Sequence, residues 1–132
     1  LFHNVEAAVR AVGLDPCLGF LHQVAYNRPS LALDVAEPFR SIVVDSVVLR
    51  CLNNGIVTPA HFTYDPAGDY PVLLDDAGRA CFIRELEARL ALAFQDPESE
   101  ERVTYRRCFE LQVRQLARCL QSGAAYRPFR VR

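Results

Sequence analysis

The sequence predicts an all-α domain of four to five helices, with one segment compatible with a small hairpin. Apolar residues recur at helical spacing in four stretches, Gly, Asn or Pro residues separate these stretches, and one region alternates like a pair of short strands. The 132 residues are the length of a single domain, and 51% hydrophobic residues are enough for a core. No apolar run is long enough to span a membrane, and the first residues lack the features of a signal peptide.

The first predicted helix covers residues 1–12, where apolar side chains fall on one helical face. Gly13 and Pro16 end it. Residues 17–29 form a turn-rich connector to the next helix.

The second predicted helix has Ser30 as a favourable N-cap and an apolar pattern from residue 31 to residue 52. Two asparagines and a glycine at 53–55 end it. Pro38 lies inside this helix and should kink it, because proline removes a helical hydrogen bond and its ring crowds the preceding turn.

The second half begins with a short helical turn at Thr58 and Pro59. Residues 62–64 and 72–74 then fit a small hairpin. Asp75 or Asp76 caps a helix that runs to about Phe94.

An acidic, solvated linker from Asp96 follows, and the last helix runs from about Val103 to Gln121 and stops at Gly123. The five cysteines are odd in number and lack metal-binding spacing, which predicts reduced, buried thiols in a cytoplasmic protein.

Three side chains with ligand chemistry lie near the start of the second helix. His22 is in the connector, and Asp34 and Glu37 are three residues apart on one helical face. Two carboxylates this close repel each other unless a proton or a cation lies between them. Each feature also has a plain structural explanation, because acids stabilise a helix start and a single histidine after apolar residues is typical of a core position.

A connector that folds back on the helix would bring His22 to Glu37. Imidazole and carboxylate with open water positions suit Mg²⁺ or Mn²⁺ and phosphoryl transfer. Two side chains alone do not hold such an ion, and Glu6 is the only acid of the first predicted helix. A partial metal site and helix capping beside a core histidine therefore both remain open.

The net charge of the chain is only −1, but acidic and basic residues are concentrated in different regions. Residues 65–101 carry ten acids and three arginines, whereas residues 102–132 carry eight arginines and one acid. We interpret the arginine-rich end as a phosphate-binding surface, with pairing to the acidic residues 96–101 as the alternative. Tyr126 and Phe129 fit either base stacking or packing of the tail on the core. The candidate phosphate-binding residues are Arg107, Arg114, Arg118, Arg127 and Arg130.

The block from Gly13 to Arg40 resembles the CRISPR-associated integrase, the spacer-acquisition nuclease of CRISPR systems. The similarity lies in a GLDP-x-LGFLH turn at residues 13–22 and an RPSLALD-x-x-EPFR helix at residues 28–40. Shorter matches extend it over nearly the whole chain, at residues 43–49, 54–56, 61–62, 78–87 and 105–129.

The resemblance implies an all-helical, C-terminal catalytic domain of a homodimeric enzyme. Such enzymes insert prespacers into a CRISPR array by attack of a 3′-hydroxyl on a phosphodiester. It also implies double-stranded DNA, both prespacer and CRISPR repeat, as substrate, and a small ferredoxin-like partner protein. The family's metal ligands are a glutamate, a histidine and a second acid.

By this resemblance, His22 matches the family histidine, Glu37 the second acid, and Asp34 a neighbouring acid that supports them. Arg40 is expected to pair with these acids. The family's glutamate and its N-terminal β-domain lie upstream of the matching residues, so we expect residues 1–132 to be a fragment with two of the three ligands.

Two other classes of function are alternatives. One is a module of the same fold that binds DNA without catalysis. The other is a metal-dependent enzyme that acts on a small molecule, which would need a pocket and a further set of ligands that the sequence does not show.

Overall fold

The structure is a computed structural model that describes residues 1–66, 68–96 and 101–130. Its helices are α1 (Phe2–Val12), α2 (Ser30–Phe39), α3 (Ser46–Asn53), α4 (Asp76–Ala91) and α5 (Tyr105–Ser122). A π-helical segment, η1 (Arg40–Asp45), joins α2 to α3, and η2 (Pro59–His61) is a 3₁₀ turn. Strands β1 (Phe62–Tyr64) and β2 (Val72–Leu74) form one antiparallel hairpin, and β3 (Ala93–Gln95) and β4 (Arg102–Thr104) form another.

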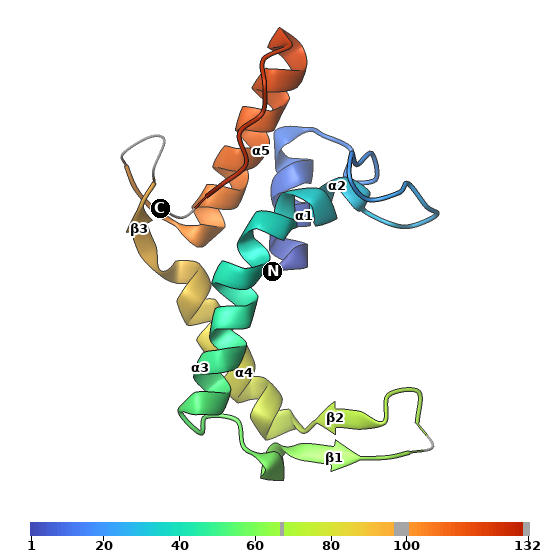
Figure 1. The fold of residues 1–132 in the computed structure, drawn as a ribbon, viewed down its shortest axis with the longest axis vertical. Coiled ribbons are helices and arrows are strands. Elements are labelled where there is room, and N and C mark those ends of the chain that lie inside the picture. Colours follow the sequence, from blue (N-terminus) through green and yellow to red (C-terminus); the bar gives the residue numbers. More distant parts are fainter. Residues whose placement is uncertain (67, 97–100, 131–132) are drawn as a thin grey trace.

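The predicted helical fold class is confirmed (Figure 1). Helices α1, α2 and α5 lie at one end of the molecule, and α3, α4 and the β1–β2 hairpin lie at the other. The continuous helical stretch of α2, η1 and α3 connects the two ends. None of the helices in the described ranges has both the length and the apolar character needed to cross a membrane.

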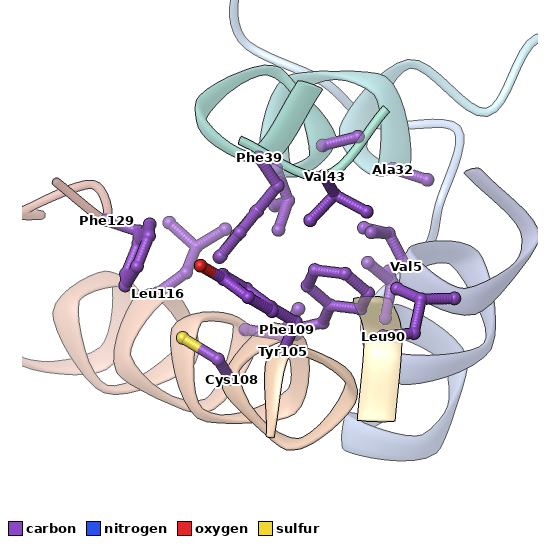
Figure 2. Packing of buried hydrophobic residues seen from close by; sticks show 14 of the residues in the cluster. Val5, Ala32, Phe39, Val43, Leu90, Tyr105, Cys108, Phe109, Leu116 and Phe129 are labelled. Atoms are coloured by element: carbon purple, nitrogen blue, oxygen red, sulfur yellow. The ribbon is translucent and has the colours of Figure 1, made fainter. Parts of the chain in front are cut away.

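The main core fills the space between α1, α2 and α5 (Figure 2). Phe39 of α2 is fully buried and packs edge-on against Phe109 of α5, with ring centroids 4.8 Å apart. It also stacks on Phe129, with centroids 4.7 Å apart. The Tyr126 hydroxyl donates a hydrogen bond to Oε1 of Gln112 at 3.0 Å. These contacts hold the C-terminal tail on the core, so packing rather than base stacking explains its two aromatic residues.

Several helix ends lie where capping chemistry predicts them. Gly13 ends α1 with φ at +90°, a left-handed conformation that glycine adopts without steric cost. Gly123 ends α5 and Asn53 is the last residue of α3. Asp75 caps α4 by accepting a hydrogen bond from the amide of Gly78 at 2.7 Å.

The predicted hairpin of residues 62–64 and 72–74 is present, and in its register Phe62 lies opposite Leu74 and Tyr64 opposite Val72. All five cysteines are free, as predicted, but only Cys51 and Cys108 are buried, whereas the other three are partly exposed.

Other local expectations were wrong. Ser30 is the first residue of α2 and not its N-cap, which is Pro29. Helix α4 ends at Ala91 rather than near Phe94, because the chain there pairs with β4. This pairing also delays the start of α5 to Tyr105, and Asp96 is buried rather than solvated. The rest of the predicted acidic linker, residues 97–100, lies outside the described residues.

The predicted disturbance at Pro38 takes the form of the π-helical segment η1, and α2 and α3 run in different directions in Figure 1. The carbonyl of Ile42 in η1 accepts hydrogen bonds from Nε and Nη2 of Arg89, at 3.1 and 2.8 Å. It also accepts one from the Ser46 hydroxyl at 2.6 Å. A side chain of α4 thus stabilises the irregular turn that follows the proline.

Candidate metal centre

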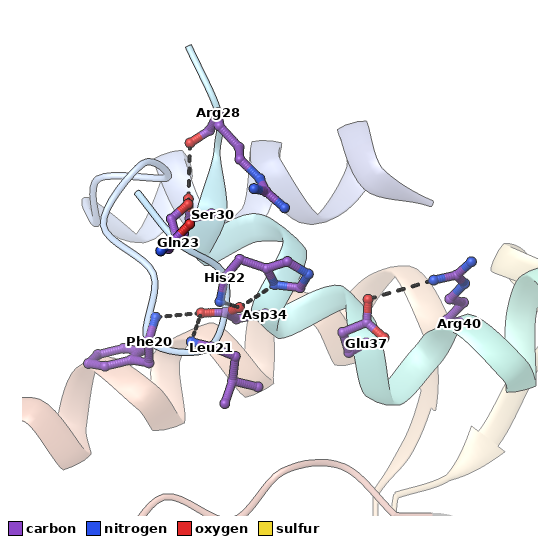
Figure 3. Close-up of polar contacts among 9 residues, drawn as sticks. All are labelled: Phe20, Leu21, His22, Gln23, Arg28, Ser30, Asp34, Glu37 and Arg40. Carbon is purple, nitrogen blue, oxygen red and sulfur yellow. Dashed lines mark hydrogen bonds and ion pairs between the residues drawn. The ribbon is translucent and has the colours of Figure 1, made fainter. Parts of the chain in front are cut away.

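The connector before α2 folds back over the first turns of that helix and is held there by Asp34 (Figure 3). One carboxylate oxygen, Oδ2, accepts hydrogen bonds from the amides of Phe20 and Leu21 at 2.5 and 3.0 Å. The other, Oδ1, lies 3.0 Å from the amide of His22 and 2.6 Å from Nδ1 of its ring. Asp34 therefore organises the turn that carries the histidine.

The hydrogen bonds to Asp34 also determine the charge of its carboxyl group. Burial of the Asp34 carboxylate would by itself raise its pKa, but the hydrogen bonds from Leu21, Phe20 and His22 outweigh that effect and lower the pKa. An ionised carboxylate accepts the proton of Nδ1–H, and in the neutral imidazole that makes this contact the lone pair is on Nε2. This arrangement, a carboxylate behind a histidine, is the one that orients metal-binding imidazoles.

Glu37 is one turn further along α2 and is much less constrained. Its side chain is 44% exposed, and Nη1 of Arg40 lies 3.9 Å from its Oε1, too far for a hydrogen bond. Figure 3 shows the imidazole of His22 over α2, on the side toward Glu37. The expected partnership of Arg40 with the acids is thus a loose contact with Glu37 alone among the described residues.

The donor set fits part of a divalent metal site. Nε2 of His22 and the Glu37 carboxylate have the chemistry that Mg²⁺ or Mn²⁺ takes from proteins. Within the part of the chain that the structure describes, no group of three His, Cys, Asp or Glu side chains is placed to hold an ion. Glu6 instead pairs with Arg10 in α1, at 2.8 Å.

A cleft of about 490 Å³ lies beside Asp34 and Glu37. The sequence did not predict this cleft. Asp34 and Glu37 line it together with mostly apolar side chains from the connector, α2, the end of α5 and the tail. Its walls come from segments far apart in the sequence, so no local pattern indicates it. Apolar lining residues include Phe20, Leu21, Val35, Pro38, Leu116 and Leu120.

The five candidate arginines are all exposed, but they differ in their partners. Arg107 and Arg114 both form ion pairs with Glu110 on the same helix. The hydrogen bonds from Arg114 and Arg107 lower the pKa of Glu110, and the bond from Arg114 has the larger effect. Arg118, Arg127 and Arg130 have no ion pair with another described residue, which leaves their guanidinium groups available to an anionic ligand.

Known proteins similar to this chain were found by sequence and by structure. Residues 1–88 match the family model of CRISPR associated protein Cas1. The CRISPR-associated endonuclease Cas1 3 of Thermus thermophilus is 44% identical over all of this chain, which spans 39% of that relative's length.

Two solved structures share the fold. A casposase bound to its integration product superposes with a TM-score of 0.82 and 31% identity, over 94% of this chain and 35% of the casposase. A Cas6-RT-Cas1–Cas2 complex contains a chain with a TM-score of 0.76, over 93% of this chain and 13% of that one. At 20% identity the second likeness concerns the fold alone. The family match and the relative at 44% identity together establish that this chain belongs to the Cas1 family of CRISPR-associated proteins.

Proposed function

We propose that this chain is the C-terminal catalytic domain of a metal-dependent DNA endonuclease and integrase, which inserts spacers into CRISPR arrays. The observation that carries the proposal is the 2.6 Å contact between Asp34 and Nδ1 of His22, which leaves Nε2 as the ring nitrogen that can bind a metal ion. The relative named as an endonuclease and the casposase bound to an integration product support the same class of reaction.

In this proposal, His22 and Glu37 hold Mg²⁺ or Mn²⁺, and Asp34 orients His22. The bound ion would polarise the phosphodiester and stabilise the departing oxygen. As the family resemblance implies, a glutamate outside residues 1–132 would provide the third ligand.

The substrate of the proposed reaction is double-stranded DNA, in the form of prespacer and CRISPR repeat. Exposed arginines on α5 and the tail would contact backbone phosphates, which arginine binds in bidentate geometry. We further propose a homodimer and a small ferredoxin-like partner protein, as the family resemblance implies.

The test is strand transfer by the complete protein with Mn²⁺, comparing His22→Ala and Glu37→Gln with the wild type. Loss of a ligand removes several kcal/mol of charge stabilisation, so each variant should be slower by roughly 100-fold or more. His3→Ala and Glu6→Gln change the same residue types in α1 and should retain activity. Undiminished strand transfer in the His22 or Glu37 variant would contradict the assignment.

A DNA-binding module without catalysis is the second candidate. It is favoured by the lack of a third ligand among the described residues and by the exposed arginines. Duplex binding that weakens steeply with salt, without cleavage or strand transfer by the complete protein, would support it over the enzyme. Absence of any DNA binding would count against the arginine surface in both cases.

A further inference from the structure

We propose that Ser30 is a positioning residue that holds His22 in place by tying the connector to the start of α2. The inference rests on the proposed function of His22 as a metal ligand. Asp34 holds His22 itself, whereas Ser30 contacts the segment that follows His22 in the chain, residues 23–28.

The hydroxyl of Ser30 contacts both ends of that loop. Its Oγ lies 3.0 Å from the carbonyl oxygen of Gln23, the residue directly after His22, and 3.3 Å from that of Arg28. Ser30 is fully buried, so water does not compete for these bonds. The chain is thus fixed at the His22 amide by Asp34 and at the next carbonyl by Ser30.

Close packing puts the turn directly on this part of α2. A Cβ added to Gly19 would lie 2.7 Å from Cβ of Ser30 and 2.8 Å from Oδ2 of Asp34. Ser30 and Asp34 are four residues apart and therefore share one face of the helix. The turn before His22 has no space to shift toward α2. The Ser30 hydroxyl therefore bonds a segment that already packs against the helix.

The loop beyond Gln23 has little else to hold it. Tyr26 is fully exposed, and Asn27 has a positive φ of 53°. Two backbone bonds hold its far end: the amide of Arg28 donates to the carbonyl of Ala25 at 3.1 Å, and the amide of Ser30 donates to the carbonyl of Arg28 at 2.8 Å. Without the Ser30 hydroxyl, the carbonyl of Gln23 would lose its hydrogen bond to α2, and the chain directly after His22 would be held less firmly.

The experiment uses the complete protein with Ser30→Ala, and Ser30→Cys as a variant that nearly keeps the volume but donates weakly. The matched control is Ser46→Ala, because the Ser46 hydroxyl also donates to backbone carbonyls, at 2.6 and 3.2 Å, but in α3. Hydrogen exchange is measured by mass spectrometry on peptides covering residues 19–24, and Mn²⁺ affinity by titration calorimetry, each without DNA.

Both Ser30 variants should accelerate exchange of the amides of residues 20–22 by about tenfold and weaken Mn²⁺ binding by about tenfold or more, whereas Ser46→Ala leaves both unchanged. Unchanged exchange at 20–22 would overturn the proposal, as would exchange accelerated equally throughout the protein. If His22→Ala abolishes Mn²⁺ binding, Ser30 variants with accelerated local exchange but wild-type Mn²⁺ affinity would also overturn the proposal. Wild-type Mn²⁺ affinity in His22→Ala would instead overturn the proposed function, while exchange still decides whether Ser30 holds the connector.

Discussion

Oδ1 of Asp34 lies 2.6 Å from Nδ1 of His22 and 3.0 Å from the amide nitrogen of the same residue. A single oxygen therefore fixes both the ring and the backbone of the histidine. Glu37, three residues further on, has no comparable constraint and is 44% exposed. The two acids on this face of α2 therefore have different surroundings, because the connector covers Asp34 and leaves Glu37 open to a ligand.

Asp34→Asn should weaken Mn²⁺ binding by about 10- to 100-fold, because an amide cannot accept all the hydrogen bonds that the carboxylate accepts. Titration of the complete protein with Mn²⁺ measures this. Asp15→Asn is the control, since Asp15 also accepts a backbone amide bond in the connector, from Cys17 at 2.9 Å. Equal affinity of Asp34→Asn and wild type would exclude this role for Asp34.

Phe39→Ala should lower the free energy of unfolding by about 3–5 kcal/mol, because it leaves a cavity where α2, α5 and the tail meet. Denaturant unfolding of the complete protein provides the measurement. Phe20→Ala removes an exposed ring from the connector and should change stability by no more than about 0.5 kcal/mol. A similar loss in both variants would show that the core stack is not specifically important.

Arg89→Met should destabilise the protein by about 1–3 kcal/mol, because the Ile42 carbonyl in the π-helical segment loses two hydrogen bonds. Arg79→Met is the control, since Arg79 is exposed and its pair with Asp76, at 3.5 Å, is on the surface. Thermal or denaturant unfolding would compare them. If the two variants are equally stable, Arg89 does not support the turn.

Glu110→Gln should raise affinity for duplex DNA by up to about fivefold at low salt, because Arg107 and Arg114 lose an exposed partner that competes with phosphate. Glu85→Gln makes the same charge change in α4, where Glu85 pairs with Arg50. Binding isotherms at several salt concentrations distinguish a local effect from one of net charge. Equal gains in both variants would point to net charge alone.

The same glutamate predicts a pH dependence of stability. Arg114 and Arg107 lower the pKa of Glu110 in the folded protein, so its contribution is present above the ordinary glutamate value of about 4.3. It is lost as the pH falls through the lowered folded-state pKa. The unfolding free energies of wild type and Glu110→Gln should therefore converge on acidification, and a difference that persists or grows would contradict the pairing.

Features that depend on neighbouring residues were predictable from the sequence. Gly13 and Gly123 end their helices and Asp75 caps α4, because caps involve residues only a few positions apart. The hairpin of residues 62–64 and 72–74 was predictable because turn residues separate its two short strands. The second hairpin was missed for the opposite reason. Its strands carry no alternation strong enough to outweigh the helical pattern on either side, and their pairing becomes visible only when the chain is folded.

The sequence by itself determined the helical class of this protein and placed His22, Asp34 and Glu37 in one block, because spacing along a helix is a local property. Only the tertiary structure showed that Asp34 contacts both the ring and the backbone of His22, that the Ser30 hydroxyl contacts the connector, and that two of the arginines are already paired. Hydrogen bonds across a folded connector depend on distances in space that no sequence periodicity encodes. The cleft beside Glu37 is a result of the same kind, since its walls meet only after α2, α5 and the tail have packed together.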